Sequence, residues 1–447
     1  MLRVFDAHGN RIAWRAFRRL QENGLGSNGI DDALLDPATL AVSRTGPLFS
    51  SDGTGAGDPA LTLPTREPKA LSLAWPTSSG YSNLIFRLPG GGTYDFNLLA
   101  AGQVLDDIGT SLAARSWYHP SSRFATLYTT AQSQYSRARA ARSEMRRGSL
   151  AARSLDEGVR AEMLLVAQAG IAYAAAHTGS AQWGATFDTI TGGDADLKTA
   201  AALYSNDGWL RICFDPGEKP AYYAAEIKHA HALGLRVVGQ ILDSSEMRRW
   251  SVAAFEKRTR DYVGALPDVD EWETGNEISG NWLGSTRSVV EKTRYASQYV
   301  KSHTHARVLV TLYWQLGEDT IANSTFTWAL ANMGSIAPYV DDLGLSLYPR
   351  HSPMGEPFDR VIAALHNQFP QQRILITELD YDGGRGWWWG SPNSVLHGRD
   401  AVAAQYQSAI VGYPYSGGGT YWWYFVEEVS PGNALYRTLK SVYRSAH

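Results

Sequence analysis

The chain has 447 residues, of which 44% are hydrophobic, so it can build a large core and more than one domain. Its net charge of -3 excludes the basic excess of a general nucleic-acid-binding protein, and a single cysteine, Cys213, excludes an internal disulfide framework. We expect no signal peptide and no membrane span, because no stretch approaches the roughly 20 apolar residues that a span needs. An exported protein with its signal removed would look the same, so the localisation stays unknown.

The first 118 residues carry a β pattern. Apolar and polar residues alternate over 71–75 and 94–98, and glycine-rich turns separate such segments. We predict a β-sandwich-like accessory domain over residues 1–118. It could bind carbohydrate, but the pattern favours a structural role.

Residues 119–178 are predicted to be a helical connector. Between 121 and 176 the chain is rich in Ala, Arg, Ser and Gln and contains no proline. Gly148 followed by Ser149 is the weakest point of the pattern, so we expect the helices to break there.

From residue 179 to 447, short apolar runs alternate with amphipathic helical stretches. The predicted strands lie near 183–188, 209–214, 236–243, 270–277, 307–314, 342–348, 373–380 and 419–426. The predicted helices lie near 194–205, 221–233, 252–265, 288–302, 325–337, 358–368, 400–411 and 433–445. Eight such units fit a (β/α)8 TIM barrel of the α/β class, with a doubly wound open sheet as the alternative.

In a (β/α)8 barrel the chemistry lies at the carboxyl ends of the strands. The fourth predicted strand ends in Asn276 and Glu277, and the seventh carries Glu378 at its end. The other strand ends supply polar and aromatic candidates for substrate binding, namely Arg211, Asp243, Trp314, Tyr348, His351, Trp422 and Trp423. No Ser-His-Asp order, nucleophile elbow or phosphate-binding loop occurs among them.

Two carboxyl groups that flank one bond are what glycoside hydrolysis requires, one protonated and one ionised. Glu277 would be kept protonated by partial burial and by the charge of Glu378. Glu378 would stay ionised beside Arg211 and a hydroxyl donor such as Tyr348. Asn276 is placed to bond the 2-hydroxyl group of the sugar.

These residues carry a resemblance to a known group. Asn276 and Glu277 after strand four, with Thr377 and Glu378 at the end of strand seven, resemble the clan A glycoside hydrolases. The resemblance covers residues 180–447 and implies a barrel enzyme that retains anomeric configuration. It implies that Glu277 is the acid/base and Glu378 the nucleophile.

The resemblance also implies roles for the neighbours. Arg211 is similar to the strand-two arginine that supports the nucleophile, and Tyr348 to the strand-six residue beside it. Trp422 or Trp423 is similar to the strand-eight tryptophan under the sugar. The motif around Glu378 looks xylanase-like, whereas that around Glu277 looks closer to β-xylosidase and exopolysaccharide hydrolase relatives, so no single family is assigned.

We therefore predict a retaining O-glycosyl hydrolase that cleaves β-glycosidic bonds by double displacement and needs no cofactor. The abundance of tryptophan, including residues 387–389, favours endo action on a polysaccharide such as a xylan, a glucan or an exopolysaccharide. An exo-acting β-glycosidase such as a β-xylosidase is the alternative.

Two other function classes stay open. One is a carbohydrate-binding barrel without catalysis. The other is a metal-assisted lyase or aldolase, because four acids could in principle hold a hard cation, namely Asp243, Glu246, Glu277 and Glu378.

Overall fold

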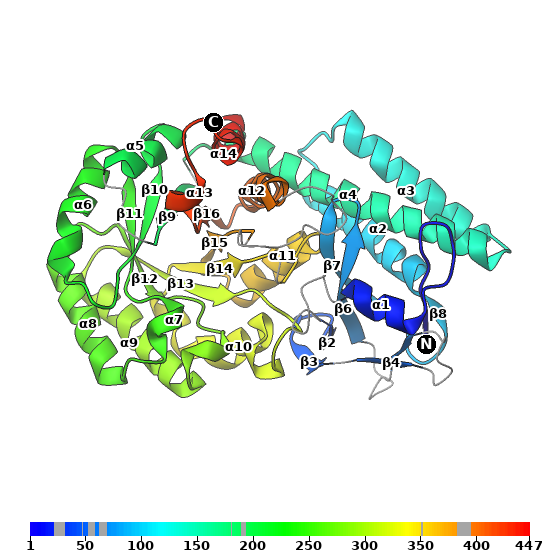
Figure 1. Ribbon diagram of the computed structural model, residues 1–447, viewed down its shortest axis with the longest axis horizontal. Helices are drawn as coiled ribbons and strands as arrows, with labels where there is room; N and C mark the ends of the chain where they lie inside the picture. Colours follow the sequence, from blue (N-terminus) through cyan, green and yellow to red (C-terminus); the bar gives the residue numbers. More distant parts are fainter. Residues whose placement is uncertain are drawn as a thin grey trace.

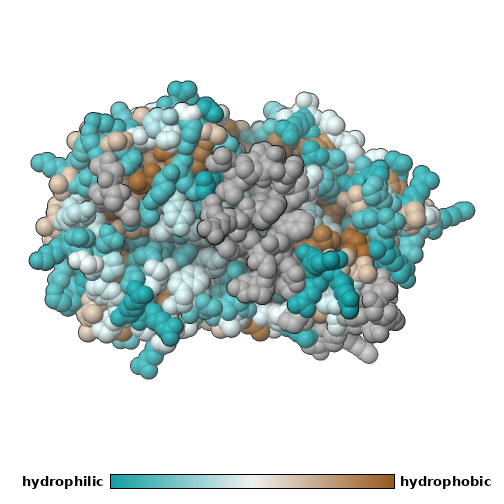
Figure 2. Space-filling view, viewed as in Figure 1, coloured by the Kyte–Doolittle hydropathy of each residue, from teal (hydrophilic) through white to brown (hydrophobic). Residues whose placement is uncertain are grey.

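The structure is a computed structural model. It describes residues 1–21, 32–46, 48–51, 59–61, 69–179, 181–188, 194–349, 352–381 and 395–447. A barrel occupies one half of the molecule, and small sheets packed with helices occupy the other (Figure 1). Figure 2 shows the same face, on which hydrophilic side chains cover most of the described surface. The apolar sides of the helices are thus turned inward, as their amphipathic sequences predict.

Residues 182–422 contain a closed barrel of eight parallel strands. Each strand pairs with the next in the chain, and β16 pairs with β9 to close the ring. The strands are β9 (Gln182–Phe187), β10 (Trp209–Cys213), β11 (Arg236–Gln240), β12 (Glu271–Gly275), β13 (Arg307–Tyr313), β14 (Asp342–Leu347), β15 (Arg373–Leu379) and β16 (Ser416–Trp422). The predicted (β/α)8 barrel is therefore confirmed, and the open-sheet alternative is wrong.

Helices surround this barrel (Figure 1). They are α5 (Asp194–Leu203), α6 (Pro220–Ala232), α8 (Val252–Ala265), α9 (Thr286–His303), α10 (Thr325–Asn332), α11 (Phe358–Gln368), α12 (Val395–Ile410) and α14 (Ala434–Ala446). Two short helices follow strands, namely α7 (Ser244–Met247) and α13 (Phe425–Glu428). Two 3-10 turns also follow strands, at Asn281–Leu283 and Ile321–Asn323, and two more follow α10, at Met333–Ser335 and Ala337–Tyr339. All eight predicted helices are present, although α10 ends at Asn332 and passes into 3-10 turns.

The last barrel strand is displaced from its prediction. We expected it near 419–426, but β16 spans Ser416–Trp422 and α13 begins at Phe425. The strand opens with Gly417, Gly418 and Gly419, which have no side chains to display the alternation of a strand.

The N-terminal region differs from a β-sandwich. Its described strands include one four-stranded antiparallel sheet in the order β3-β2-β6-β7. These strands are β2 (Ala33–Leu35), β3 (Val42–Thr45), β6 (Lys69–Thr77) and β7 (Gly80–Leu88). Two small pairs accompany it, β1 (Leu2–Arg3) with β8 (Tyr94–Asp95) and β4 (Phe49–Ser51) with β5 (Pro59–Leu61).

Helices, rather than a second large sheet, pack against the described part of this sheet. They are α1 (Trp14–Gln21) and α2 (Phe96–Ala114). The ring of Phe96, the first residue of α2, lies 4.6 Å from that of Trp75 on β6. The predicted strand at 94–98 is therefore wrong beyond Asp95. Alternating apolar residues over so short a segment also fit the first turn of a buried helix.

Two antiparallel helices make the connector, α3 (Ser122–Ala140) and α4 (Glu144–Ala176). They are capped by Ser121 and Ser143, whose side chains accept backbone N–H groups. The break lies at residues 141–143, so the break expected at Gly148 is wrong. A side chain at Gly148 would meet the ring of Phe5 at 2.4 Å, so this glycine permits close packing inside a continuous helix.

Helix α4 joins the two halves of the molecule. By length and composition it is the one described helix that could cross a membrane. However, it packs against α2 and α3 on one side and against α12 and α14 of the barrel on the other. Its apolar residues are thus used in the core that joins the halves.

Candidate active site

The two predicted catalytic glutamates meet at the carboxyl ends of the barrel strands. Glu277 follows β12, and Glu378 lies near the end of β15. Both side chains are buried, with 7% and 3% of their surface exposed. One hydroxyl links them: Ser346 Oγ lies 2.6 Å from Glu277 Oε1 and 3.4 Å from Glu378 Oε1. These two oxygens are therefore no farther apart than the sum of those distances, about 6 Å.

The backbone at Glu277 is strained. Its φ of 50° lies in the left-handed region, which is uncommon for residues other than glycine. A bulge in β12 precedes it, and the N–H of Gly280 donates to its carbonyl at 2.8 Å to close a turn. Gly275 allows this path, because a Cβ there would meet Ile278 and Thr293 at 2.7–2.8 Å. The turn directs the carboxyl group toward the barrel axis.

Arg211 of β10 is fully buried between two acids. Its Nε donates to Glu273 Oε2 at 2.7 Å, and its Nη2 lies 3.0 Å from Glu378 Oε2. The other oxygen of Glu273 accepts a hydrogen bond from Thr311 Oγ1 at 2.5 Å. Arg211 thus holds Glu378 in place and is itself fixed by Glu273.

Glu378 has further partners on both carboxyl oxygens. The hydroxyl of Tyr348 donates to Oε1, and Asn276 Nδ2 donates to Oε2 at 3.3 Å. The oxygen of the same Asn276 side chain accepts the backbone N–H of Ser244 at 3.0 Å. The structure therefore brings Arg211 and Tyr348 to Glu378, as expected from the sequence, and adds a contact from Asn276, for which the sequence analysis predicted a bond to the sugar.

A different set of contacts surrounds Glu277. Ser244 Oγ donates to its Oε2 at 2.7 Å and accepts a hydrogen bond from the Trp282 indole N–H at 3.1 Å. Asp243, a predicted binding residue, caps α7 by accepting the N–H of Ser245 at 2.9 Å. Glu277 thus has hydroxyl partners, whereas Glu378 has a cation.

Burial sets the protonation of the pair. It raises the pKa of Glu277 to about 7, against the hydrogen bonds from Ser346 and Ser244, which lower it. Burial and the charge of Glu277 raise the pKa of Glu378 well above its usual range, while Arg211 and Tyr348 act in the opposite direction. At neutral pH the pair therefore retains at least one proton.

The predicted aromatic residues fall into different places. Trp314 and Trp422 are completely buried, and the indole N–H of Trp422 donates to Glu428 at 2.9 Å. Trp423 is half-buried, and its ring centre lies 5.4 Å from the guanidinium of Arg211. His351 and the tryptophans at 387–389 lie outside the described residues. Among the described candidates, Trp423 and Tyr348 have partly exposed rings next to the carboxyl pair.

Sequence reasoning missed four contributors. Ser244 and Ser346 contact the carboxyls, Glu273 fixes Arg211, and Trp282 contacts Ser244. Ser244, Ser346 and Trp282 stand near or after the ends of strands, but serine at a strand end is too common to indicate a site. Glu273 lies inside β12, where it alternates with Trp272, a pattern that indicates a structural residue rather than a site.

The described residues contain no group of three or more His, Cys, Asp or Glu side chains that could hold a metal ion. The four acids considered for a cation site are therefore not gathered around one point. In particular, Glu246 forms its ion pair with Arg249 at 2.6 Å.

Replacing Arg211 by methionine is expected to lower the free energy of unfolding by about 3–5 kcal/mol, because Glu273 and Glu378 would lose their buried cation. Urea unfolding followed by circular dichroism measures this. Arg236→Met is the matched control, since Arg236 is exposed and lies 3.6 Å from an exposed Asp207. An equal loss of unfolding free energy in both variants would contradict a stabilising role of the ion pairs of Arg211 with Glu273 and Glu378.

The similarity of this chain to known proteins is low. No protein-family model and no curated protein sequence matches the chain. A fungal β-1,4-galactanase structure is similar at 15% identity, over 54% of this chain and 89% of that one, with a TM-score of 0.39. The family 1 β-glucosidase of Thermotoga maritima is similar at 10% identity, over 55% and 88%, also with a TM-score of 0.39.

A mandelate racemase/muconate lactonizing enzyme from a marine actinobacterium is similar over more of the chain. This similarity covers 81% of this chain and 88% of the other, at 9% sequence identity and a TM-score of 0.32. Clan A glycoside hydrolases are therefore among the solved barrels to which this chain is similar, and at these identities the likeness concerns the fold alone.

Proposed function

We propose that this chain is a retaining β-glycoside hydrolase, with Glu277 as the acid/base and Glu378 as the nucleophile. The observation that carries the proposal is the short link through Ser346, which limits the two carboxyl oxygens to a separation of about 6 Å. Retaining enzymes hold their carboxyls about 5–5.5 Å apart, whereas inverting enzymes need about 6.5–9.5 Å to admit a water molecule.

The contacts support this division of roles. Glu378 touches the guanidinium of Arg211 and accepts a hydrogen bond from Tyr348, both of which favour a carboxylate. Glu277 accepts hydrogen bonds from two serine hydroxyls, which can donate to a carboxylate or accept from a carboxylic acid. We assign the shared proton to Glu277 on these contacts, although burial and the charge of Glu277 also raise the pKa of Glu378.

In the first step, a carboxylate oxygen of Glu378 attacks the anomeric carbon and the bond to the leaving oxygen breaks. Glu277 gives its proton to that oxygen. In the second step, Glu277 takes a proton from water, the water oxygen attacks the same carbon, and Glu378 is released. Two inversions give net retention, and the enzyme returns to its starting protonation.

Aromatic rings flank the carboxyl pair on two sides. Trp423 lies near Arg211 and Glu378, and Trp282 packs edge-on against Tyr313, with ring centres 5.1 Å apart, on the side of Glu277. Flat rings of this kind bind the C–H faces of sugars. We therefore propose an oligo- or polysaccharide substrate of the xylan, glucan or exopolysaccharide type, with endo action.

Proton NMR during hydrolysis of a panel of aryl β-glycosides tests the proposal. We expect the β-anomer to form first and then to mutarotate. First appearance of the α-anomer would overturn the retaining assignment. Binding of sugars without any hydrolysis across the panel would instead favour a non-catalytic carbohydrate-binding barrel. The sizes of products from polysaccharides distinguish endo from exo action.

The pH–rate profile should lose activity as pH rises through about 7, because Glu277 must be protonated to act as an acid and its pKa lies near that value. In Ser346→Ala the alkaline limb should move to higher pH, by roughly half to one unit, because a hydrogen bond that lowers this pKa is removed. Ser245→Ala, next to Ser244 but exposed, is the control. A limb that moves to lower pH, or that moves equally in the control, would contradict this prediction.

A further inference from the structure

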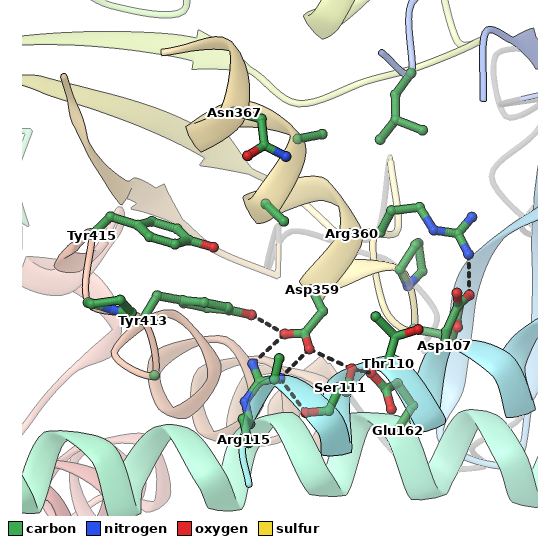
Figure 3. A pocket seen from close by; sticks show the side chains of 18 of the residues that line it. Asp107, Thr110, Ser111, Arg115, Glu162, Asp359, Arg360, Asn367, Tyr413 and Tyr415 are labelled. Carbon is green, nitrogen blue, oxygen red and sulfur yellow. Dashed lines mark hydrogen bonds and ion pairs between the residues drawn. The ribbon is translucent and has the colours of Figure 1, made fainter. Parts of the chain in front are cut away.

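A second cavity lies outside the barrel, where the N-terminal half meets it. Its volume is about 500 Å³, which is within the usual range for small-molecule sites. Helices α2 and α4 form one side, and α11 with the loop before β16 forms the other (Figure 3). Neither Glu277 nor Glu378 lines it, so it is separate from the candidate active site.

Two ion pairs cross this cavity and join the halves of the molecule. Arg115, the residue that follows the last turn of α2, binds both carboxyl oxygens of Asp359 of α11. Arg360 of α11 pairs with Asp107 of α2. Figure 3 shows the side chains of Arg115, Ser111 and Tyr413 converging on Asp359. Both arginines that line the cavity are therefore already matched by an aspartate.

Two further acids line the same cavity, Glu162 near Arg115 and Glu356 near Arg360, and within the described part of the chain neither forms an ion pair of its own. Glu162 is 1% exposed and Glu356 is 2% exposed. Oε1 of Glu162 accepts a hydrogen bond from Ser111, and the carboxyl group of Glu356 shares a hydrogen bond with Asp107. Among the described residues, Oε2 of Glu162 and Oε1 of Glu356 have no hydrogen-bond partner. Buried carboxyl oxygens of this kind are costly unless a donor reaches them. The cavity therefore has an excess of acid and two unused acceptors.

Four aromatic side chains line the remaining wall, among alanine, proline and other small residues. Tyr413 and Tyr415 are stacked with ring centres 5.5 Å apart. Trp117 lies 5.8 Å from Tyr173, and 46% of its surface is exposed. Aromatic faces attract both apolar rings and organic cations. The wall thus offers contact for a ring-sized body beside the acids.

We propose that this cavity binds an organic ammonium ion carried on a ring-sized body, with the ammonium group at Glu162 and Glu356 and the ring against the aromatic wall. The ammonium group would supply hydrogen bonds to the two unused oxygens and balance the excess acid. An amino sugar and an apolar cyclic amine share this chemistry. The proposal is independent of the catalytic roles assigned above.

Binding should release a proton. Burial and the charge of Asp359 raise the pKa of Glu162 to about 8, while Ser111 and Arg115 act in the opposite direction. Burial and the charge of Asp107 raise the pKa of Glu356 well above its usual range. At pH 7 both acids are therefore largely protonated in the empty cavity, and a bound cation would favour their ionised forms.

Isothermal titration calorimetry of the full chain at pH 7 tests the proposal with matched probes. Cyclohexylmethylammonium is compared with cyclohexylmethanol, which has the same body without charge. We expect the ammonium to bind about tenfold more tightly or better, consistent with a charge-assisted hydrogen bond. Glucosamine and glucose form the second pair of probes. Comparing the two pairs shows whether the cavity prefers an ammonium ion on a sugar or on an apolar ring. Titrations in two buffers of different ionisation heat measure the released proton.

Glu162→Gln keeps the shape of the side chain and removes its charge. It should weaken ammonium binding about tenfold and reduce proton release to the share of Glu356, whereas Glu157→Gln on the same helix, which removes an ion pair with Arg160 outside the cavity, should do neither. Trp117→Ala, at an exposed position, should weaken the cyclohexyl probe without unfolding the chain. Equal binding of charged and neutral probes, no binding of either ammonium at millimolar concentration, or an unchanged Glu162→Gln variant would each overturn the proposal.

Discussion

Alanine in place of Glu378 is expected to lower the turnover of an aryl β-glycoside by several orders of magnitude, because the covalent intermediate can no longer form. Stopped assays of the released phenol measure this loss. Azide should restore activity by occupying the space of the missing carboxylate, and its product should be the α-glycosyl azide. That product would show that one displacement, rather than two, has taken place.

The matched control for this variant is Glu246→Ala. Glu246 is also an acid beyond a barrel strand, but its partner is Arg249 rather than the carboxyl pair. We expect near-normal turnover in this variant. Wild-type turnover of Glu378→Ala, or a β-configured azide product, would remove Glu378 from the role of nucleophile.

Alanine in place of Glu277 is expected to cost on the order of 10²–10⁴-fold in rate, the usual contribution of a general acid. The loss should depend on the leaving group. A dinitrophenyl glycoside needs little protonation, so its first step should be almost unaffected, whereas an alkyl or sugar leaving group should lose the full amount. The alkaline limb of the pH–rate profile should also disappear.

Leaving-group dependence separates the two glutamates. The slope of log kcat/KM against the pKa of the leaving phenol should be steeper in Glu277→Ala than in the unaltered protein. An unchanged slope would contradict the assignment of Glu277 as the acid, even if overall activity fell. A uniform fall across all leaving groups would instead indicate damage to Glu378 or to the fold.

Much of the barrel could be predicted from the sequence because its signals are local. A parallel strand buried on both faces is an unbroken apolar run, and each surrounding helix has its own amphipathic period. Polar residues at the ends of such runs, such as Glu277 and Glu378, therefore stand out. The ends of β16 were misplaced for the same reason, since its glycines weaken the local signal.

The N-terminal half was harder to predict because its elements depend on distant partners. Phe96 begins a helix that packs against Trp75, although the residues around it alternate like a strand. Gly148 reads as a helix break, yet it lies inside α4 because Phe5, which is far away in the sequence, occupies the space beside it. Local propensity was overridden by tertiary packing at both positions.

The sequence by itself determined the barrel, the strands that carry Glu277 and Glu378, and the positions of Arg211, Asn276 and Tyr348, since each follows from a periodic pattern and its end point. Only the tertiary structure decided which hydroxyl joins the two carboxyls, because Ser346 comes from another strand. It also decided how Arg211 is shared between Glu273 and Glu378, and that in the described part of the chain one oxygen each of Glu162 and Glu356 lacks a hydrogen-bond partner. These are relations between atoms far apart in the chain, and burial makes their charges interact strongly.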